Sequence, residues 1–245
     1  MLKIIFLLCC CILPNKLSGQ GIFLPQVTES ENIIHHFAFS LLYSEKHEQP
    51  KWVAYTLTKE QLEYPKMSSR DGTEFVPDPD IKEGSANSED YYDIKRIGID
   101  RGHLIPAADV SWSFTAMKES FYYSNISPQY ADFNRGIWLK LENQVREWGR
   151  EKGKIYIVTG PVLTGEYKAI GPNNVSIPDY FYKVLLRYGK SDTTGIGFII
   201  PNQKSSLDPL YYSVSIDSVE IFTGIDFFPS LPDKLEEKLE SMTVK

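Results

Sequence analysis

One histidine of this chain stands among residues that could carry out acid-base chemistry. His103 ends the segment Asp100-Arg101-Gly102-His103, in which an acid, a cation and a glycine precede the imidazole. An imidazole has an unperturbed pKa of about 6.5, so it is largely neutral near pH 7 and can accept a proton. For this segment alone, a structural role in the core is the alternative. The other histidines (His35, His36 and His47) are interpreted as surface or structural residues.

Polar residues downstream of His103 favour the chemical role. Asn125-Ile126-Ser127-Pro128-Gln129 is followed by Asn134-Arg135-Gly136, and then by Leu141-Glu142 and Arg146. Asn134 and Glu142 are eight residues apart, a little over two helical turns. On a helix they differ by about 80° around the axis, so both can address one cavity.

A helix is expected to carry Glu142. Its apolar residues form a single stripe at helical spacing, namely Ile137, Trp138, Leu141, Val145 and Trp148. Asn134 lies just before this stripe, at a position typical of a helix start, and Gly153 is expected to end the helix. Trp138 is interpreted as a core residue. Stacking on a nucleic-acid base is the alternative, which also applies to Tyr122 and Tyr123.

Short strands and loops are predicted for most of the remaining chain. Strand patterns occur at 37–43, 52–57, 154–159, 180–188 and 195–200, a long polar loop at 68–92 and a final helix at 230–239. Strands and helices do not alternate regularly, which favours an α+β fold over a parallel α/β sheet. No composition shift marks a boundary, so residues 20–245 are expected to form a single domain.

The N-terminus has the features of a secretory signal peptide. Lys3 precedes a continuous apolar run from Ile4 to Leu13, which is too short to span a bilayer, and cleavage is expected near Gly19. A short buried helix is the alternative for this run. We therefore expect residues 1–19 to be a signal peptide and the protein to be secreted or periplasmic, without stable membrane association afterwards. A lipid anchor on Cys9, Cys10 or Cys11 is less favoured, because bulky residues precede these cysteines.

Composition excludes several classes of protein. All three cysteines lie in the apolar run, so a mature chain has neither a disulfide framework nor a thiolate metal site. The net charge of −6 argues against tight, processive binding to nucleic acid, because proteins with polyanionic partners are usually basic. It leaves room for a hydrolase that meets its substrate through a local basic cleft.

The combined pattern resembles the DNA/RNA non-specific endonuclease family, the ββα-metal group that includes endonuclease G and secreted bacterial nucleases. Similarity extends over nearly the whole mature chain, through Trp52-Val53-Ala54-Tyr55, Asp78-Pro79, Thr159-Gly160-Pro161 and 198–202. The resemblance implies a central, mostly antiparallel sheet flanked by helices, with a ββα-metal motif at the active site. It also implies cleavage of DNA and RNA that leaves 5′-phosphate ends.

The resemblance implies roles for three of these residues. His103 would be the general base that takes a proton from the attacking water. Asn134 would be the only direct protein ligand of a metal ion, which suits Mg²⁺ because this ion keeps several waters; Mn²⁺ is the alternative. Glu142 would hold the metal through a water molecule, or else be a solvated carboxylate on the helix face.

Further residues match family positions around the scissile phosphate. Arg70, Arg101 and Arg146 would form the basic cleft, with Arg70 the preferred transition-state clamp. Arg101 and Arg146 could instead be paired with Asp100 or Glu142. Asp100 would hold a nearby group in place. Asn125 would orient the site through hydrogen bonds or have a purely structural role.

Two other functions are compatible with the sequence. The chain could be a catalytically inert binding protein with a nuclease-like fold, although His103, Asn134 and Glu142 are all present. It could also hydrolyse another phosphodiester, an idea to which the acidic composition gives some support. The sequence gives no indication of oligomeric state.

Overall fold

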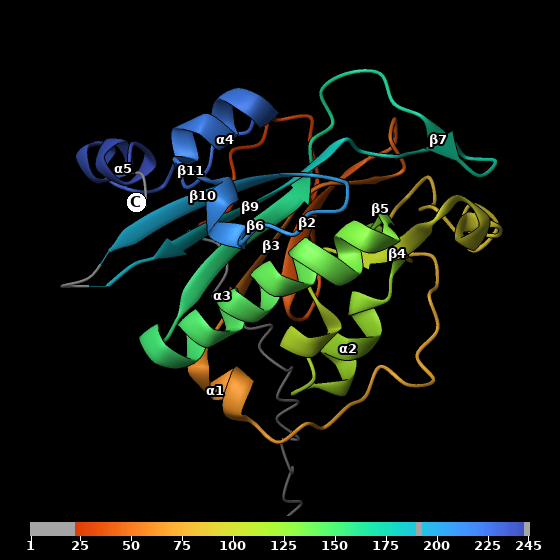
Figure 1. Cartoon of the computed structure of the whole chain (residues 1–245), viewed down its shortest axis with the longest axis horizontal. Helices are drawn as coiled ribbons and strands as arrows, with labels where there is room; N and C mark the ends of the chain where they lie inside the picture. The colour runs from red at the N-terminus through yellow and green to blue at the C-terminus, as the bar shows by residue number, and fades with distance from the viewer. Residues whose placement is uncertain (1–22, 190–192, 243–245) are drawn as a thin grey trace, which may run out of the picture.

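A seven-stranded antiparallel sheet runs through the middle of the protein in the computed structural model, which describes residues 23–189 and 193–242 (Figure 1). In spatial order its strands are β1 (Ile33–His35), β2 (Phe39–Ser44), β3 (Gln49–Leu57), β6 (Ile155–Pro161), β9 (Tyr180–Arg187), β10 (Thr194–Pro201) and β11 (Ser213–Val214). Each neighbouring pair is antiparallel. The expectation of a mostly antiparallel central sheet is confirmed. The predicted signal peptide at 1–19 lies outside the described residues.

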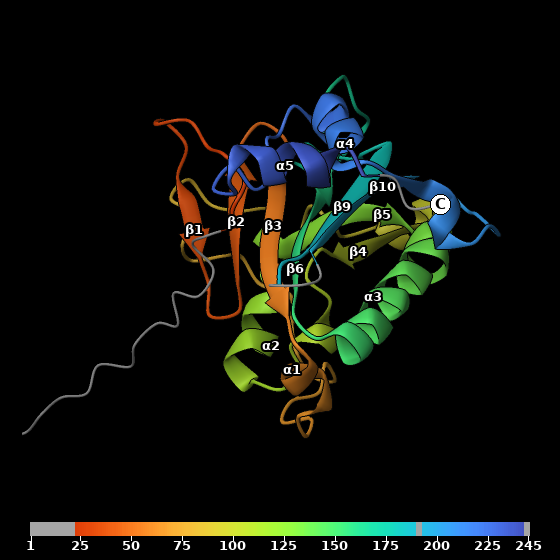
Figure 2. The ribbon, with the colours of Figure 1, turned by 90° about the vertical axis from the view of Figure 1, so that its left-hand side faces the viewer.

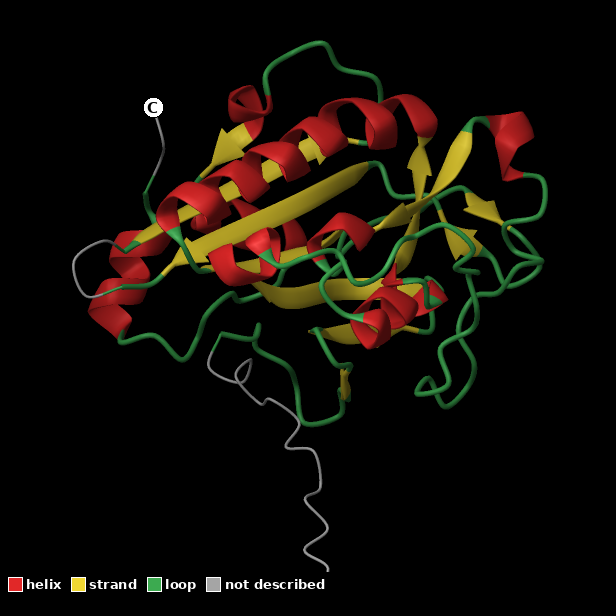
Figure 3. Cartoon of the chain, turned by 90° about the horizontal axis from the view of Figure 1, so that it is seen from below, coloured by secondary structure: helices red, strands yellow, loops and turns green. Residues whose placement is uncertain are grey.

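Helices cover both faces of this sheet (Figures 1 and 2). One face carries α1 (Lys59–Glu63), α2 (Phe114–Ser120) and α3 (Leu139–Lys152), and the other carries α4 (Ile216–Thr223) and α5 (Asp233–Glu240). Figure 3 shows the first group in front of the long strands. Together the sheet and its two helical layers form a single α+β domain, as expected. None of the helices within the described residues combines the length and the apolar character needed to cross a bilayer.

The strands bury side chains on both faces, which gives the domain two cores. Along β9, Phe181 and Leu185 pack with Trp138 and Leu141 on the side of α3. The alternate residues Tyr182, Val184 and Leu186 pack on the other side with Ile216 and Val219 of α4. This alternation follows from the period of two in a strand.

A two-stranded sheet lies beside the first core and leads into α3. Strand β4 (Ile99–His103) pairs antiparallel with β5 (Ile126–Tyr130), and a π-helical turn at Phe133–Trp138 joins β5 to α3. The turn contains non-helical backbone at Gly136 and is anchored by Phe133, whose ring lies 5.2 Å from Phe181. Strands β4 and β5 with α3 therefore form a ββα unit, as the resemblance implied.

The predicted strands are confirmed as β2, β3, β6, β9 and β10, with ends shifted by up to three residues. The expected C-terminal helix is α5, and residues 65–93, all described, form no helix or named strand. Helices α1, α2 and α4 were not predicted. They have five, seven and eight residues, too short for a periodic apolar stripe, and hydroxyl caps begin them at Thr58, Ser113 and Ser215.

The remaining elements are short. They are β7 (Ala169–Ile170), β8 (Val175–Ser176) and four 3₁₀ helices at Ile94–Ile97, Ala107–Asp109, Tyr123–Asn125 and Pro209–Tyr212. Strands β7 and β8 pair with each other and belong to a small third cluster of buried residues around Tyr91 and Tyr123. The long loop at 68–92 contributes Phe75 to this cluster.

Candidate active site

Side chains from four parts of the chain line one cavity of about 650 Å³. Most of them come from the loop at 66–70, the end of β4, the π-helical turn and α3, and others come from the segment 106–111 and from Met117 of α2. Six of the predicted site residues are among them: Arg70, Arg101, His103, Asn134, Glu142 and Arg146. The other two do not line the cavity: Asp100 bonds Asn134 and Arg135, which do line it, and Asn125 bonds Ile105 and Ser120, which do not.

His103 is the last residue of β4 and is partly buried against two aromatic rings. Its ring lies 4.7 Å from Phe121 in an edge-to-face arrangement and 5.4 Å from Phe75. Burial lowers the pKa of His103 to about 3, and the Arg70 guanidinium acts in the same direction. The imidazole is therefore neutral at physiological pH, and its buried Nε2 has no hydrogen-bond partner among the described residues.

Gly102 lies against the buried side chain of Gln129 on β5. A Cβ atom at this position would lie 2.2 Å from Cδ of Gln129, which extends from the neighbouring strand. Real Cβ atoms do not approach other atoms so closely, so a larger residue would force the buried Gln129 side chain to move. This packing gives a physical reason for a glycine beside the histidine.

Asn134 is held by Asp100, which lies on the opposite face of β4 from His103. Nδ2 of Asn134 donates a hydrogen bond to Oδ2 of Asp100 at 2.9 Å. Oδ1 of Asn134 therefore stays available as an acceptor. Arg135 donates to both oxygens of the same carboxylate. Burial alone would raise the pKa of Asp100, but the hydrogen bonds from Arg135 and Asn134 bring it below its usual value.

Glu142 is partly buried on α3, and its carboxylate has no hydrogen bond to the described residues. Burial raises the pKa of Glu142 to about 7, while the cations Lys183 and Arg146 act against this rise. The side chain is therefore a free acceptor at the cavity wall and not a solvated carboxylate on an outer helix face.

The three predicted arginines have different surroundings. Arg70 is exposed on the long loop. Arg101 donates to the carbonyl of Tyr91 at 3.2 Å, and its guanidinium lies 5.5 Å from the ring centre of Phe75. Arg70 and Arg101 form no ion pair with any described residue, whereas Arg146 is buried and bonded to Asp109 and Asn143. Two of the three guanidinium groups thus remain free to bind an anion.

Arg146 and Asp109 form a buried ion pair beneath the cavity. Nη1 of Arg146 donates to Oδ1 of Asp109 at 2.7 Å, and Nη2 donates to Asn143 at 2.8 Å. The hydroxyl of Tyr55 donates to the other oxygen of Asp109. The alternative partners considered from sequence, Asp100 for Arg101 and Glu142 for Arg146, are not the ones found. Asp100 and Arg101 are adjacent in β4 and therefore point to opposite faces. Arg146 pairs with Asp109 in place of Glu142.

Asn125 is fully buried and fixes the backbone just after His103. Its Oδ1 accepts from the amide of Ile105 at 2.9 Å, and its Nδ2 donates to the carbonyls of Ile105 and Ser120. It is thus a positioning residue for the end of β4.

Sequence reasoning assigned no role to Asp109 or Lys183. Lys183 is fully buried on β9, its Nζ has no hydrogen bond to any described residue, and Nζ lies 4.8 Å from the ring centre of Trp138. The available signals were an acid within the apolar context Ala107-Ala108-Asp109-Val110 and a lone lysine in a strand of buried residues. Neither feature indicates which residues Asp109 and Lys183 contact, because the contacting residues come from distant parts of the chain.

Other polar groups gather outside the cavity. Ligand atoms of His36, Asp78 and Asp80 lie within 4.8 Å of one another. His36 Nε2 is 2.8 Å from Asp78 Oδ2, which also accepts a hydrogen bond from Ser124. His47 is buried and bonds Ser176, and His35 bonds Ser40. These contacts agree with structural roles for the three histidines.

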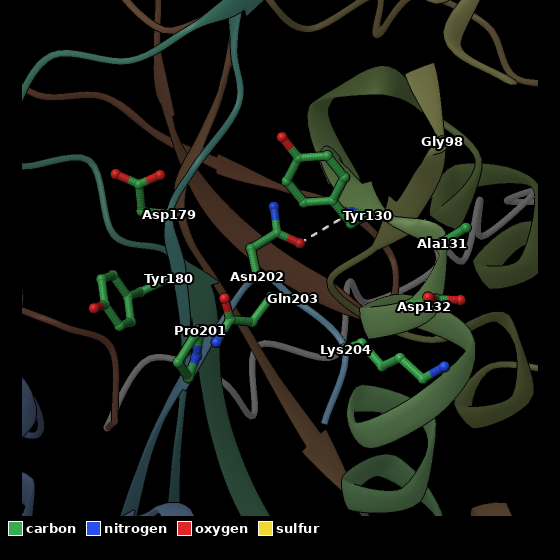
Figure 4. A pocket seen from close by; sticks show the side chains of 10 residues that line it. All are labelled: Gly98, Tyr130, Ala131, Asp132, Asp179, Tyr180, Pro201, Asn202, Gln203 and Lys204. Atoms are coloured by element: carbon green, nitrogen blue, oxygen red, sulfur yellow. Dashed lines mark hydrogen bonds between the residues drawn. The ribbon is translucent and has the colours of Figure 1, made fainter. Parts of the chain in front are cut away.

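A second hollow, of about 720 Å³, lies beside the start of the π-helical turn (Figure 4). Its walls include Tyr130, Asp132, Tyr180 and Lys204, and Asn202 at its centre accepts a hydrogen bond from the amide of Tyr130. None of the predicted site residues lines it. The cavity of about 650 Å³ is therefore the candidate active site, because it contains the side chains that can carry out the chemistry.

The residues of the active-site cavity fit a hydrated divalent cation. Three groups around it that could form hydrogen bonds have no partner in the described part of the chain: Oδ1 of Asn134, the carboxylate of Glu142 and Nε2 of His103. One neutral oxygen and one more distant carboxylate suit Mg²⁺, which keeps most of its waters.

The fold and the site define a known class of nuclease. Residues 22–234 match the DNA/RNA non-specific endonuclease family, and the chain belongs to this family. The family confirms the resemblance drawn from the Asp-Arg-Gly-His segment and the residues that follow it.

Individual relatives are similar over most of the described chain. The mitochondrial nuclease EXOG of Danio rerio is 34% identical over 207 residues, covering 78% of this chain and 59% of the relative. Mitochondrial endonuclease G of Caenorhabditis elegans is 33% identical and covers 83% and 70%, respectively. In a solved complex of EndoG with EndoGI, the matched chain has a TM-score of 0.78 at 29% identity, covering 86% of this chain and 90% of that one. The chain spans about three fifths of the length of the EXOG relatives.

The expectation of a secreted or periplasmic protein is contradicted by these relatives. Those from Danio rerio and Caenorhabditis elegans are named mitochondrial nucleases. An apolar run after a lysine is a property of composition alone. It was therefore not sufficient to distinguish a secretory signal peptide from another kind of targeting sequence.

Proposed function

We propose that this protein is a metal-dependent endonuclease that hydrolyses phosphodiester bonds of DNA and RNA and leaves 5′-phosphate ends. The observation that supports this function is the convergence of His103, Asn134 and Glu142 on one cavity with two free guanidinium groups. Contacts to phosphate and sugar carry no sequence information, so such a site suits cleavage without strong sequence preference.

In this mechanism His103 accepts a proton from the water that attacks phosphorus. The new bond from the water oxygen to phosphorus forms as the bond to the 3′-oxygen breaks, and the departing oxygen takes a proton from solvent. Proton transfer to a positioned base typically contributes about 10²- to 10⁴-fold to the rate. The low pKa of His103 keeps the imidazole neutral, as this step requires.

Arg70 and Arg101 would bind the non-bridging oxygens of the scissile phosphate. A guanidinium group can donate two parallel hydrogen bonds to phosphate, which fixes its orientation as well as its charge. Arg70 lies on the loop and is exposed, so it is free to act as the transition-state clamp. The engagement of Arg146 with Asp109 gives it a supporting role beneath Glu142.

Asn134 would hold the divalent cation directly, and Glu142 would hold it through a bound water. When bound, Mg²⁺ or Mn²⁺ supplies positive charge that stabilises the departing 3′-oxygen. Asp100 orients Asn134 by binding its amide nitrogen. A hydrogen bond from a metal ligand to a neighbouring carboxylate commonly sets the orientation of that ligand.

Digestion of plasmid DNA and of RNA with and without EDTA tests this function. We expect both substrates to be degraded, EDTA to stop degradation and added Mg²⁺ to restore it. Failure to cut either polymer would favour an inert binding protein or a hydrolase of another phosphodiester. Cleavage that resists the chelator would contradict the role of the metal.

A further inference from the structure

An apolar hollow opens beside the candidate active site. It has a volume of about 430 Å³, and its apolar walls are Tyr64, Met67, Trp112 and Phe114. The side chain of Phe114 is 64% exposed and that of Tyr64 is 54% exposed. Exposed apolar side chains that gather around a hollow mark a binding surface, whereas scattered ones need no explanation.

The hollow shares a wall with the active-site cavity. Met67 lines both of them. The backbone amides of Met67 and Ser68 donate to the carbonyl of Ser111 at 2.9 and 3.1 Å. Ser111 lines the active-site cavity and directly precedes Trp112. The loop that carries Arg70 is therefore tied to the segment that carries the aromatic wall.

The aromatic wall is held in place by the same groups that support the active site. Trp112 donates from Nε1 to the carbonyl of Asp109 at 3.0 Å, and the carboxylate of Asp109 binds Arg146. The ring of Phe37 lies 5.9 Å from Trp112 on another side. Figures 1 and 2 both place α1 and α2 next to each other, on the face of the sheet that carries α3.

We propose that this hollow is a stacking subsite for an unpaired nucleobase of the strand whose phosphate is cleaved. The inference rests on the proposed function and names the substrate class more closely. A base within a duplex is stacked on its neighbours, so only a single-stranded or locally opened segment can place a base against Trp112 and Phe114. The favoured substrate is therefore single-stranded nucleic acid.

The chemistry of the walls favours a base over a phosphate. The hollow has no lysine or arginine among its lining residues, and Glu60 would repel an anion. Aromatic side chains accept any base, because every base has a π face. Stacking here would increase the affinity for the nucleic-acid strand without distinguishing one base sequence from another. The shared wall at Met67 favours a base of the bound strand over a separate protein partner.

Cleavage by a Phe114→Ala variant tests the subsite. The measured quantity is the ratio of kcat/KM for single-stranded oligodeoxyadenylate to kcat/KM for bis(p-nitrophenyl) phosphate, which has no base. We expect this ratio to fall about tenfold, mainly through KM, because stacking of one base typically contributes this much or more. The matched control is Tyr211→Ala, which removes a 72% exposed aromatic side chain outside the hollow and should leave the ratio as it is. An unchanged ratio in Phe114→Ala would overturn the subsite.

A binding measurement separates this inference from the proposed function. In EDTA, with His103→Ala as background, oligodeoxyadenylate should quench tryptophan fluorescence, and Trp112→Phe should remove most of the quenching. Trp52 and Trp138 are fully buried and thus shielded from the ligand. Phe114→Ala should weaken the apparent affinity about tenfold. Plasmid cleavage by the unmodified protein without such quenching would overturn the subsite alone. Quenching without cleavage of plasmid DNA, RNA or the oligonucleotide would overturn the endonuclease function and leave the hollow as a site that binds a base.

Discussion

The amide nitrogen of Asn134 donates a hydrogen bond to the Asp100 carboxylate at 2.9 Å, and this contact fixes which atom of Asn134 can bind a cation. Since Nδ2 is engaged, Oδ1 remains as the free ligand atom. Asp100 and His103 come from the same strand but from opposite faces. One short strand thus places the proposed base and also orients the proposed metal ligand.

Asp100→Ala should raise the Mg²⁺ concentration needed for half-maximal activity by about 10- to 100-fold, because Asn134 would lose its orienting partner. A magnesium titration of plasmid cleavage measures this. Asp132→Ala, which removes a nearby exposed carboxylate, is the control and should behave like the unmodified protein. An unshifted titration for Asp100→Ala would argue that Asn134 is held by other contacts.

His103→Ala should lower the rate of plasmid cleavage by at least about 10²-fold, since the attacking water would lose its general base. Circular dichroism should show a folded protein, because the imidazole makes no hydrogen bond through Nε2. Near-normal cleavage would refute the assignment of His103 as the base.

Gly102→Ala should destabilise the protein by roughly 1–3 kcal/mol, the usual cost of overpacking. The new Cβ would lie 2.2 Å from Cδ of Gln129. Unfolding in urea measures the effect. The double variant with Gln129→Ala removes the clashing atoms and should recover part of the loss. If the effects of the two substitutions on the free energy of unfolding are additive, steric conflict with Gln129 is not the reason for the glycine.

Asp109→Ala should cost about 3–5 kcal/mol in the free energy of unfolding, because it leaves the Arg146 guanidinium buried without its carboxylate. The side chains of this pair are 9% and 3% exposed. The control is Glu147→Ala, which breaks an exposed pair with Arg150 and should cost no more than about 1 kcal/mol. Equal losses of unfolding free energy in the two variants would mean that the buried pair stabilises the fold no more than the exposed pair does.

Stability should fall as the pH drops from 6.5 towards 3, in part through His103. The pKa of His103 is lowered to about 3 in the folded protein, while it is about 6.5 in the unfolded chain. Between these values the unfolded chain binds a proton that the folded protein does not, so acid favours unfolding. Urea unfolding in EDTA at several pH values should show a shallower decline for His103→Gln. An identical decline would show that burial does not depress this pKa.

Local patterns were sufficient to predict the main strands and α3. The apolar stripe from Ile137 to Val145 does lie on the core side of α3, and Gly153 ends that helix at a φ of 86°. The π-helical turn before α3 was not predicted. It depends on the fit of Phe133 against Phe181, a contact between residues distant in sequence.

The residues that face the substrate were easier to predict than the residues that support them. His103, Asn134 and Glu142 meet in one cavity as expected. The pairing of Arg146 with Asp109 was not foreseen, because Asp109, which also accepts a hydrogen bond from Tyr55, reaches Arg146 through tertiary packing. Tyr123, considered as a base-stacking residue, is 1% exposed and belongs to a buried cluster. Spacing along a chain indicates which residues share an element, but burial and pairing depend on the whole fold.

All side chains around the active-site cavity come from residues 66 to 146, and the described residues outside that interval contribute none. The far layer with α4 and α5 is separated from the reacting groups by the full thickness of the sheet. Substitutions in that layer can therefore leave the lining of the cavity in place, because the whole lining belongs to one continuous segment of the chain.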